Sequence, residues 1–356
     1  MKIIFRWFGS NDDSVTLEQI RQIPGKPGIA GTLGDIPAGE AWPANRIDAL
    51  KKQVEDAGLK LEVIESVNIH DSIKTGAPER DKCIENYITT IERLGSRGVK
   101  VICYNFMPVF DWTRSDLYKK LEDGSTALSY EQKEIDKINP ENIAQTISKG
   151  SKGYSLPGWE PERMSRIKEL FAAYTEVTEE KLRDNLKYFL DAIIPSCEKY
   201  DVKMAIHPDD PPWGIFGLPR IVRNESDITK LLSMCSSPYN GLTLCTGCLG
   251  ASTANDIPAM IRKFADRIHF THVRNIKIHS EGDFNETSHL SADGSLDLYE
   301  IMKAYYDVGY TGYLRPDHGR MIWNEQARPG YGLYDRALGI AYINGLWEAI
   351  NKGNRA

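Results

Sequence analysis

The sequence predicts an α/β protein, a (β/α)8 barrel with one long insertion after the fourth strand. Short β-rich runs alternate with longer amphipathic runs along the whole chain, which is typical of a parallel sheet covered by helices. Eight such β-rich runs can be counted. A barrel of this kind takes about 250 residues before insertions, so a chain of 356 residues has length to spare. We expect a single domain over residues 1–356.

The strands are expected at the β-branched and aromatic runs. These are residues 3–9, 28–34, 60–66, 99–106, 202–208, 241–247, 268–274 and 312–319. The amphipathic segments between them are expected to be helices. They are residues 45–59, 83–98, 181–200, 227–235, 256–267 and 296–310. Three of these segments end in Gly58, Gly98 or Gly309 just before the next strand, as helix C-termini often do.

The spare length lies mostly between the fourth strand and the next barrel helix, at residues 107–177. This stretch is rich in Pro, Gly, Ser and charged residues, with a helix-like piece at 130–138 and a Gly-rich run at 148–159. Long loops in compact domains are usually functional. We therefore expect a lid, an interface or both, and a passive surface excursion is the alternative.

Composition narrows the classes of ligand. The net charge is −6, with Lys, Arg, Asp and Glu evenly mixed, so we expect no nucleic-acid partner. The longest apolar runs are strand-sized, far below the roughly 20 residues of a membrane helix, and no membrane association is expected. The N-terminal run is interrupted by Arg6 and has no small-residue cleavage site, which predicts a cytoplasmic protein with six cysteines as free thiols. A small-molecule ligand is favoured.

Potential metal ligands stand at four successive strand ends: His207, Cys245, His272 and Asp317. Each alone has an ordinary structural explanation, but the carboxyl ends of barrel strands meet on one face. Strand alternation places Arg274 on the side of His272 and Arg315 on that of Asp317. Imidazole, thiolate and carboxylate suit Mn²⁺, Fe²⁺, Co²⁺ or Zn²⁺. The pattern predicts a divalent metal site with room for substrate.

Two local motifs bear on this site. In CTGC, Cys245 and Cys248 could form a redox pair or half a zinc knuckle. The chain holds no second pair to complete a knuckle, and a redox pair would leave His207 and His272 unexplained. In HPDDPPWG, proline ends the strand, and we expect Asp209 and its neighbour Asp210 to turn into the barrel mouth.

The predicted groups suit abstraction of a proton next to a carboxylate, with the acid held by the ion and Arg274 while negative charge develops. His318 and Tyr331 are candidate general acid and base. His318 directly follows Asp317, so alternation turns it away from the ion unless the strand has ended. Tyr331 lies on the loop after the eighth strand and could close over the site.

Seven stretches together resemble the D-mannonate dehydratase family, from the first strand to the last. They are FRWFG, ESVNIHDSIKTG, VICYNFMPVFDWTR, AIHPDDPPWGIFGLPRIV, CTGCLG, FTHVRN and RPDHGR followed by PGY. The resemblance implies a barrel similar to the xylose-isomerase-like group. It also implies a Mn²⁺- or Fe²⁺-dependent lyase that converts D-mannonate to 2-keto-3-deoxy-D-gluconate plus water in hexuronate breakdown. A homodimer built partly from the insertion is implied as well.

The resemblance also assigns roles to residues. The family's metal positions fall on His207, Cys245, His272 and Asp317, and its acid and base positions fall on His318 and Tyr331. One of the latter two is expected to remove the C2 proton and the other to protonate the departing C3 hydroxyl. Cys248 stands where relatives tend to have serine, so the choice of cysteine ligand stays open. The expected substrate contacts are Arg274, Asp209, Asn105, His70, Trp112 and Arg114.

Three other functions compete. A divalent-metal sugar isomerase or epimerase on the same barrel is the nearest rival, and it would form no α-keto acid. A metal-dependent phosphodiesterase is disfavoured by the acidic charge balance and by the shortage of His and Glu ligands for a three-metal site. A non-catalytic sugar-acid-binding protein would bind without turnover and would tolerate the loss of Tyr331.

Overall fold

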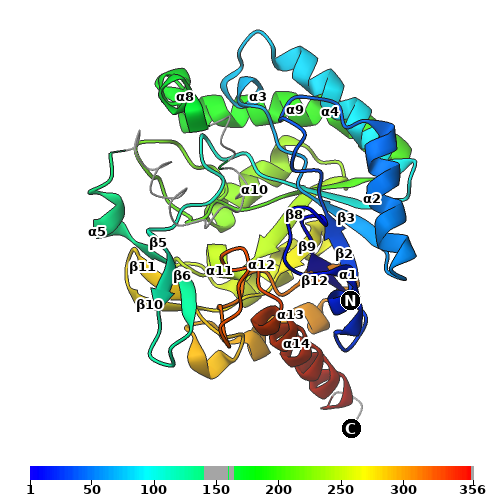
Figure 1. Ribbon diagram of the computed structural model, residues 1–356. Helices are drawn as coiled ribbons and strands as arrows, with labels where there is room; N and C mark the ends of the chain where they lie inside the picture. Colours follow the sequence, from blue (N-terminus) through cyan, green and yellow to red (C-terminus); the bar gives the residue numbers. More distant parts are fainter. Residues whose placement is uncertain (140–158, 160–163, 354–356) are drawn as a thin grey trace.

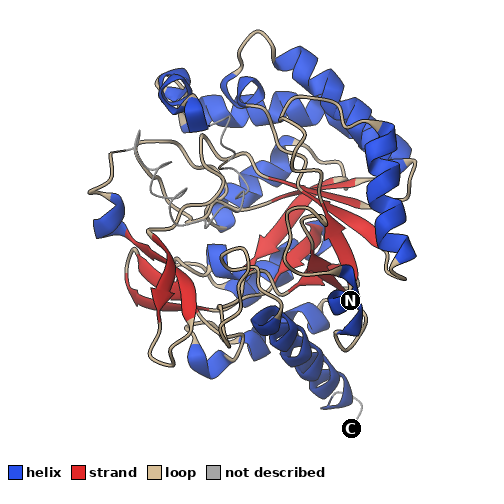
Figure 2. Cartoon of the chain, in the orientation of Figure 1, coloured by secondary structure: helices blue, strands red, loops and turns tan. Residues whose placement is uncertain are grey.

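A closed barrel of eight parallel strands forms the centre of the protein, with helices around it (Figures 1 and 2). The computed structural model describes residues 1–139, 159 and 164–353. The barrel strands are β1 (Lys2–Arg6), β2 (Gly28–Gly31), β3 (Leu61–Glu65), β4 (Val101–Tyr104), β7 (Lys203–Ile206), β8 (Asn240–Cys245), β9 (Ile268–His272) and β12 (Tyr313–Arg315). Strand β1 pairs with both β2 and β12 and so closes the barrel. The predicted fold class and all eight predicted strands are confirmed.

The six predicted helices are also confirmed, as α2, α4, α9, α10, α12 and α13. Within the described residues the α-helices are, in chain order, α1 (Leu17–Gln22), α2 (Ala44–Asp56), α3 (Asp71–Thr75), α4 (Arg80–Gly95), α5 (Gln132–Ile135), α8 (Ile167–Tyr174), α9 (Glu179–Tyr200), α10 (Glu225–Met234), α11 (Thr246–Leu249), α12 (Ile257–Phe264), α13 (Leu298–Asp307) and α14 (Tyr334–Gly353). The sequence did not predict α14, because its apolar residues are spread around the helix: Ile340 and Ile343 are buried whereas Leu338 is exposed. Among the described residues, no helix is both long and apolar enough to span a bilayer.

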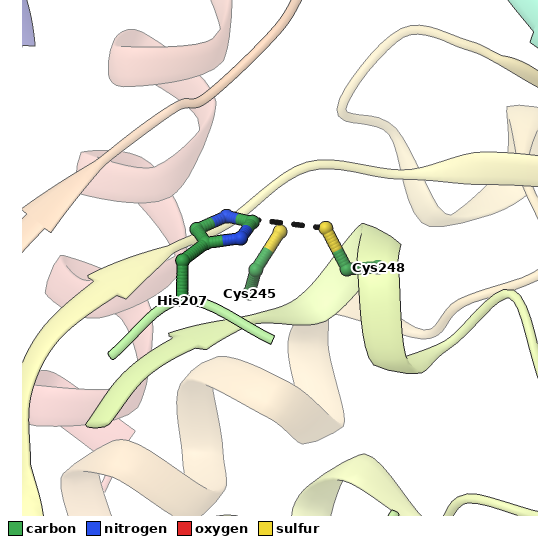
Figure 3. Close-up of side chains that lie close together, drawn as sticks. All are labelled: His207, Cys245 and Cys248. Carbon is green, nitrogen blue, oxygen red and sulfur yellow. Dashed lines mark hydrogen bonds between the residues drawn. The ribbon is translucent and has the colours of Figure 1, made fainter. Parts of the chain in front are cut away.

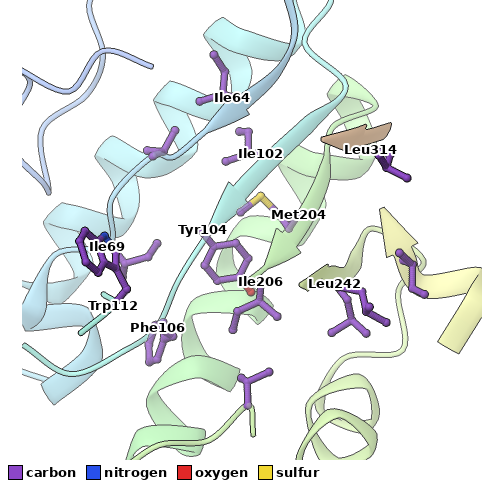
Figure 4. Packing of buried hydrophobic residues seen from close by; sticks show 14 of the residues in the cluster. Ile64, Ile69, Ile102, Tyr104, Phe106, Trp112, Met204, Ile206, Leu242 and Leu314 are labelled. Atoms are coloured by element: carbon purple, nitrogen blue, oxygen red, sulfur yellow. The ribbon is translucent and has the colours of Figure 1, made fainter. Parts of the chain in front are cut away.

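Strand alternation builds two shells of side chains. Outward-facing residues such as Ile64, Ile102 and Met204 pack in the main hydrophobic core (Figure 4). Helix α9 contributes Leu186 and Phe189, both fully buried, and burying a side chain of this size stabilises the fold by about 1.5–3 kcal/mol. The barrel wall is therefore fixed from outside, and its inner face is free to carry chemistry.

The inner face has an apolar layer with a polar layer above it. The apolar layer is formed by Ile4, Ala30, Val63, Val101, Cys103, Ala205, Phe270 and Tyr313. Because side chains alternate along a strand, the residue two positions further on points inward at a higher level. Those positions are held by polar residues on β1, β3, β7, β9 and β12, namely Arg6, Glu65, His207, His272 and Arg315. This polar layer is the floor of the site.

A second, antiparallel sheet lies beside the barrel, at the left of Figure 1. Its strands come from two separate parts of the chain, β5 (Asp116–Lys120) and β6 (Thr126–Glu131) within the predicted insertion, and β10 (Ile276–Ser280) and β11 (Asp283–Glu286) after β9. The order is β10-β11-β6-β5. The sequence predicted none of these strands.

The prediction of a helix over 130–138 is only partly right. Strand β6 runs to Glu131, because Ser129, Tyr130 and Glu131 pair with β11 and Tyr130 buries its side chain in the small sheet's core. The helix that follows is short, α5. Most of the predicted Gly-rich run at 148–159 lies outside the described residues.

Candidate active site

The barrel brings all four predicted metal ligands to its mouth. Cys245 and His272 end adjacent strands and are register partners, His207 directly follows β7, and Asp317 lies two residues beyond β12. Donor atoms of Cys245, His272 and Asp317 lie within 4.8 Å of one another, and so do those of His207, Cys245 and Cys248. The rings of His207 and His272 have centroids 5.0 Å apart. Cys245 therefore joins two overlapping groups of donors.

The charges at this place favour a bound cation. Burial by itself raises the pKa of Asp317, but the neighbouring His318 and Arg315 outweigh it and hold the pKa well below its ordinary value. Burial lowers the pKa of His207, yet Cys245 and Asp317 raise it to about 9. The raised pKa shows that the electrostatic potential at the His207 ring is negative. The donors and their charges thus fit a divalent ion.

The same charges distinguish the two cysteines of CTGC. Burial would raise the pKa of Cys245, but a hydrogen bond from Cys248 and the charge of Arg274 lower it well below the ordinary value. Burial and the neighbouring Cys245 raise the pKa of Cys248 well above it. Cys248 lies on α11, with its Sγ 4.0 Å from His207 Nε2 (Figure 3). Because the thiolate is the metal-binding form, this arrangement favours Cys245 as the ligand.

Two buried arginines that were predicted to contact substrate are paired with carboxylates of the protein. Arg274 Nε donates to Asp317 at 2.6 Å, and its other nitrogens reach Glu286 at 3.0 Å and Asp210 at 3.1 Å. Arg114 forms a bidentate pair with Asp210 at 2.8 and 2.9 Å and also donates to Glu286 at 3.0 Å. Breaking such a buried pair typically costs about 3–5 kcal/mol. These arginines fix the carboxylates around the site.

Gly247 allows Arg274 to take this position. A Cβ atom at Gly247 would lie 2.6 Å from Nε and Cζ of Arg274, closer than real side-chain atoms approach. The first turn of α11 therefore needs a residue without a side chain where the guanidinium packs against it. Packing against Arg274 thus explains the glycine of the CTGC motif. The cluster of donor atoms explains the two cysteines of the motif.

His318 points into the site although it directly follows a predicted ligand. Asp317 has φ of 51°, a left-handed conformation that ends the strand alternation. His318 then forms two hydrogen bonds, Nδ1 to Glu286 Oε1 at 2.8 Å and Nε2 to Tyr331 Oη at 2.9 Å. The two candidate acid and base residues are therefore in direct contact.

The groups on either side of His318 differ in charge. Burial raises the pKa of Tyr331 above its ordinary value, so its phenol keeps its proton at neutral pH. Burial also raises the pKa of Glu286, but His318 and Arg274 outweigh it and hold the pKa below the ordinary value. His318 thus lies between a carboxylate and a phenol.

A cavity of about 60 Å³ opens at this place. Six predicted site residues line it: His207, Asp317, His318, Tyr331, Asn105 and Trp112. Arg6, Glu65 and Asp210 line it too. His70 lines a neighbouring cavity of about 500 Å³, and Asn105 and Asp111 border both cavities.

The structure does not bring Asp209 into this cavity. Its carboxylate accepts hydrogen bonds from the backbone amides of Ile221 at 2.9 Å and Val222 at 2.8 Å. Asp209 therefore anchors the loop after β7, and its neighbour Asp210 reaches the site. Alternation alone could not decide between two adjacent acids in a proline-rich turn.

Three further residues of the site were missed as candidates. Extending strand alternation to the first and third strands would have found Arg6 and Glu65, two positions beyond the inward-facing Ile4 and Val63. Glu286 had no such signal, because it ends β11, a strand that the sequence did not predict. Its contacts arise only when the small sheet packs beside the barrel.

Comparison with known proteins gives consistent matches over the whole chain. The family model described as D-mannonate dehydratase (UxuA) matches residues 1–356. A protein of Thermotoga neapolitana named mannonate dehydratase is 60% identical over 354 residues, which are 99% of this chain and 98% of that protein. The crystal structure of mannonate dehydratase from Streptococcus suis serotype 2 matches with a TM-score of 0.89 at 46% identity, covering 99% of this chain and 96% of that one.

A more distant likeness concerns the fold alone. A xylose isomerase domain protein from Planctomyces limnophilus matches with a TM-score of 0.55 at 10% identity, covering 99% of this chain and 98% of that one. The two proteins therefore share the barrel fold.

Proposed function

Because the chain belongs to the D-mannonate dehydratase family, we infer that it is a lyase that removes water from D-mannonate and yields 2-keto-3-deoxy-D-gluconate. The observation that carries this conclusion is the family match over residues 1–356. The cluster of metal-type donors at the barrel mouth agrees with it. The reaction belongs to the breakdown of hexuronates.

We propose that His207, Cys245, His272 and Asp317 hold a divalent ion, Mn²⁺ or Fe²⁺. The support is the burial of Cys245, His272 and Asp317, the closeness of the donor atoms within the two groups that share Cys245, and the negative potential at the site. When bound, such an ion supplies a Lewis acid for the negative charge that develops on the substrate carboxylate as the C2 proton leaves. A proton α to a carboxylate is weakly acidic, so this stabilisation must contribute several kcal/mol.

The contacts of His318 suggest which residue acts as the base. Carboxylates accept hydrogen bonds, so Glu286 at Nδ1 favours the tautomer of His318 with its proton on Nδ1 and a lone pair on Nε2. Nε2 faces the cavity beside Tyr331. We propose that Nε2 removes the C2 proton.

Tyr331 is the proposed acid, since its raised pKa keeps the phenol protonated. It donates its proton to the C3 hydroxyl as the C–O bond breaks and water leaves. His318, now protonated on Nε2, returns a proton to the tyrosinate across their 2.9 Å hydrogen bond. Both groups are restored, the electron pair of the C2–H bond forms the double bond of an enol, and the enol becomes the ketone.

Other predicted contacts hold the substrate's polyol end. Asn105 and Trp112 line the catalytic cavity, and His70 lines the larger cavity next to it. The indole of Trp112 lies edge-on to His318, with ring centroids 6.3 Å apart, and helps to exclude water from the base.

The test uses protein stripped of metal and incubated with D-mannonate, with Mn²⁺, Fe²⁺ or Zn²⁺ added back separately. Formation of a 2-keto-3-deoxy acid is followed by the semicarbazide and periodate–thiobarbiturate reactions. We expect turnover with Mn²⁺ or Fe²⁺ and none in chelator. An isomerase or epimerase would change the sugar acid without forming the keto acid, and a binding protein would show no turnover, so either result would refute the proposal.

We also propose a cytoplasmic homodimer, with residues 107–177 acting as lid and interface within one domain. The six cysteines are all free, as is usual in a reducing compartment. Light scattering coupled to gel filtration tests the dimer. A monomeric mass at assay concentration would refute it.

A further inference from the structure

Arg6 is a buried cation that forms no ion pair with the described residues. It ends β1 and is 4% exposed. Its Nη1 donates a long hydrogen bond of 3.5 Å to Ala30 O, and the guanidinium carbon lies 4.3 Å from the centre of the Phe8 ring. Within residues 1–139, 159 and 164–353, no carboxylate oxygen lies within 4 Å of its nitrogens.

The other arginines of the site contrast with Arg6. Arg315 donates to Glu65 at 2.6 Å and lies 2.8 Å from Asp317, and Arg114 and Arg274 each reach two or more carboxylates at 2.6–3.1 Å. Burying an unpaired charge is costly. Burial accordingly lowers the pKa of Arg6, although Glu65 opposes the effect. A partner that arrives from outside the chain would remove this cost.

The surroundings of Arg6 suggest the chemistry of that partner. Arg6 lines the catalytic cavity together with Glu65, His318 and Tyr331. Glu65 uses one oxygen for Arg315, and its Oε2 is buried without a hydrogen-bond partner among the described residues. The cavity therefore offers a guanidinium and, on a neighbouring inward-facing residue, a free acceptor. A carboxylate with a hydroxyl on the next carbon complements both.

We propose that Arg6 binds the carboxylate of the sugar acid and sets the preference of the enzyme for acids over uncharged sugars. The proposal rests on the dehydratase function inferred above. The planar fork of a guanidinium matches the two oxygens of a carboxylate, and the donors of Arg274 already serve Asp317, Glu286 and Asp210. With C1 held at Arg6, C2 and C3 extend along the cavity that His318 and Tyr331 line.

The test compares Arg6→Gln and Arg6→Lys with the wild-type enzyme loaded with metal. KM is measured for D-mannonate, and an inhibition constant is measured for D-mannonamide, in which the carboxylate is an uncharged amide. Hydrogen bonds to charged groups contribute enough for Arg6→Gln to raise KM about 10- to 100-fold, with a smaller rise for Arg6→Lys. The inhibition constant of the amide should change less than about threefold in both variants, since the lost interaction is with the charge.

Arg183→Gln is the matched control, because Arg183 is a buried arginine of α9 paired with Asp227 at 2.9 Å and does not line the cavity. A KM for Arg6→Gln close to wild type would overturn the proposal, and so would an equal rise in both constants, which indicates a structural role. If Arg6→Gln fails to fold, Arg6→Lys provides the test. A rise in its KM for D-mannonate without an equal rise in its inhibition constant for D-mannonamide would support the proposal, and an equal rise in both would overturn it. A wild-type enzyme that forms no keto acid would instead refute the inferred function.

Discussion

Nδ1 of His318 lies 2.8 Å from Oε1 of Glu286, a carboxylate that belongs to the small antiparallel sheet and not to the barrel. The barrel supplies His318 through the turn after β12, and β11 supplies Glu286 at its last residue. Two arginines, Arg114 and Arg274, clamp the same carboxylate. The second sheet therefore has a direct role: it fixes the orientation and tautomer of the proposed base.

Replacing Glu286 by Gln should lower kcat about 10- to 100-fold, the usual effect of losing a residue that orients a catalytic or metal-bound imidazole. KM for D-mannonate should change little, since Glu286 does not line the cavity. Steady-state kinetics measure both constants. Glu131→Gln, at the partly exposed end of β6 in the same sheet and paired with Lys119, serves as the control. A wild-type kcat in Glu286→Gln would show that the contact is only structural.

Replacing Tyr331 by Phe should lower kcat about 10²- to 10⁴-fold, the range that general acid–base catalysis contributes. The ring itself should stay in place, because the variant's phenyl ring keeps the edge-on contact that Tyr331 makes with Phe8, whose ring centroid lies 4.8 Å away. Metal content, measured by atomic emission after desalting, should be that of wild type. Full kcat in this variant would remove Tyr331 from the mechanism.

The two cysteines of CTGC should respond differently to substitution by Ser. Cys245→Ser loses the thiolate of the donor cluster and should bind Mn²⁺ at least about tenfold more weakly, since a hydroxyl stays protonated where a thiol ionises. Cys248→Ser should bind Mn²⁺ as wild type does, because its thiol is kept protonated by burial. Titration of metal-stripped protein measures both affinities. Equal losses in the two variants would make Cys248 a ligand as well.

How much of this site the sequence predicts depends on how far apart in the chain the interacting residues are. Strand alternation is a local property of the sequence. It was enough to predict that His207, Cys245, His272 and Asp317 lie on the same face of the barrel. The direction of the His318 side chain depends on a left-handed φ at Asp317, and an aspartate in the sequence does not by itself predict that conformation. The position of His318 after Asp317 made it a candidate acid or base but left the direction of its side chain open.

Long-range packing accounts for what remained unpredicted. Glu286 meets Arg114, 172 positions away in the chain, only because β6 pairs with β11. The sequence of each of these two segments is typical of a loop, because neither strand shows a clear alternation of polar and apolar residues. The pairing of Arg114 with Asp210 likewise depends on how two irregular loops meet above the barrel.

A stability prediction concerns His269, near the start of β9, whereas His272 is at its end. Burial, with Lys203 and Arg267 nearby, lowers the pKa of His269 to about 3, against about 6.5 for histidine in an unfolded chain. The folded protein therefore keeps this imidazole neutral while the unfolded chain takes up a proton below pH 6.5. The contribution of neutral His269 to the free energy of unfolding is complete above pH 6.5. It is lost as the pH falls from 6.5 toward 3, by about 1.4 kcal/mol for each pH unit. Urea unfolding at pH 7.5, 6.0 and 5.0 should show the free energy of unfolding of wild type falling more steeply than that of His269→Asn, and parallel curves would contradict the assignment.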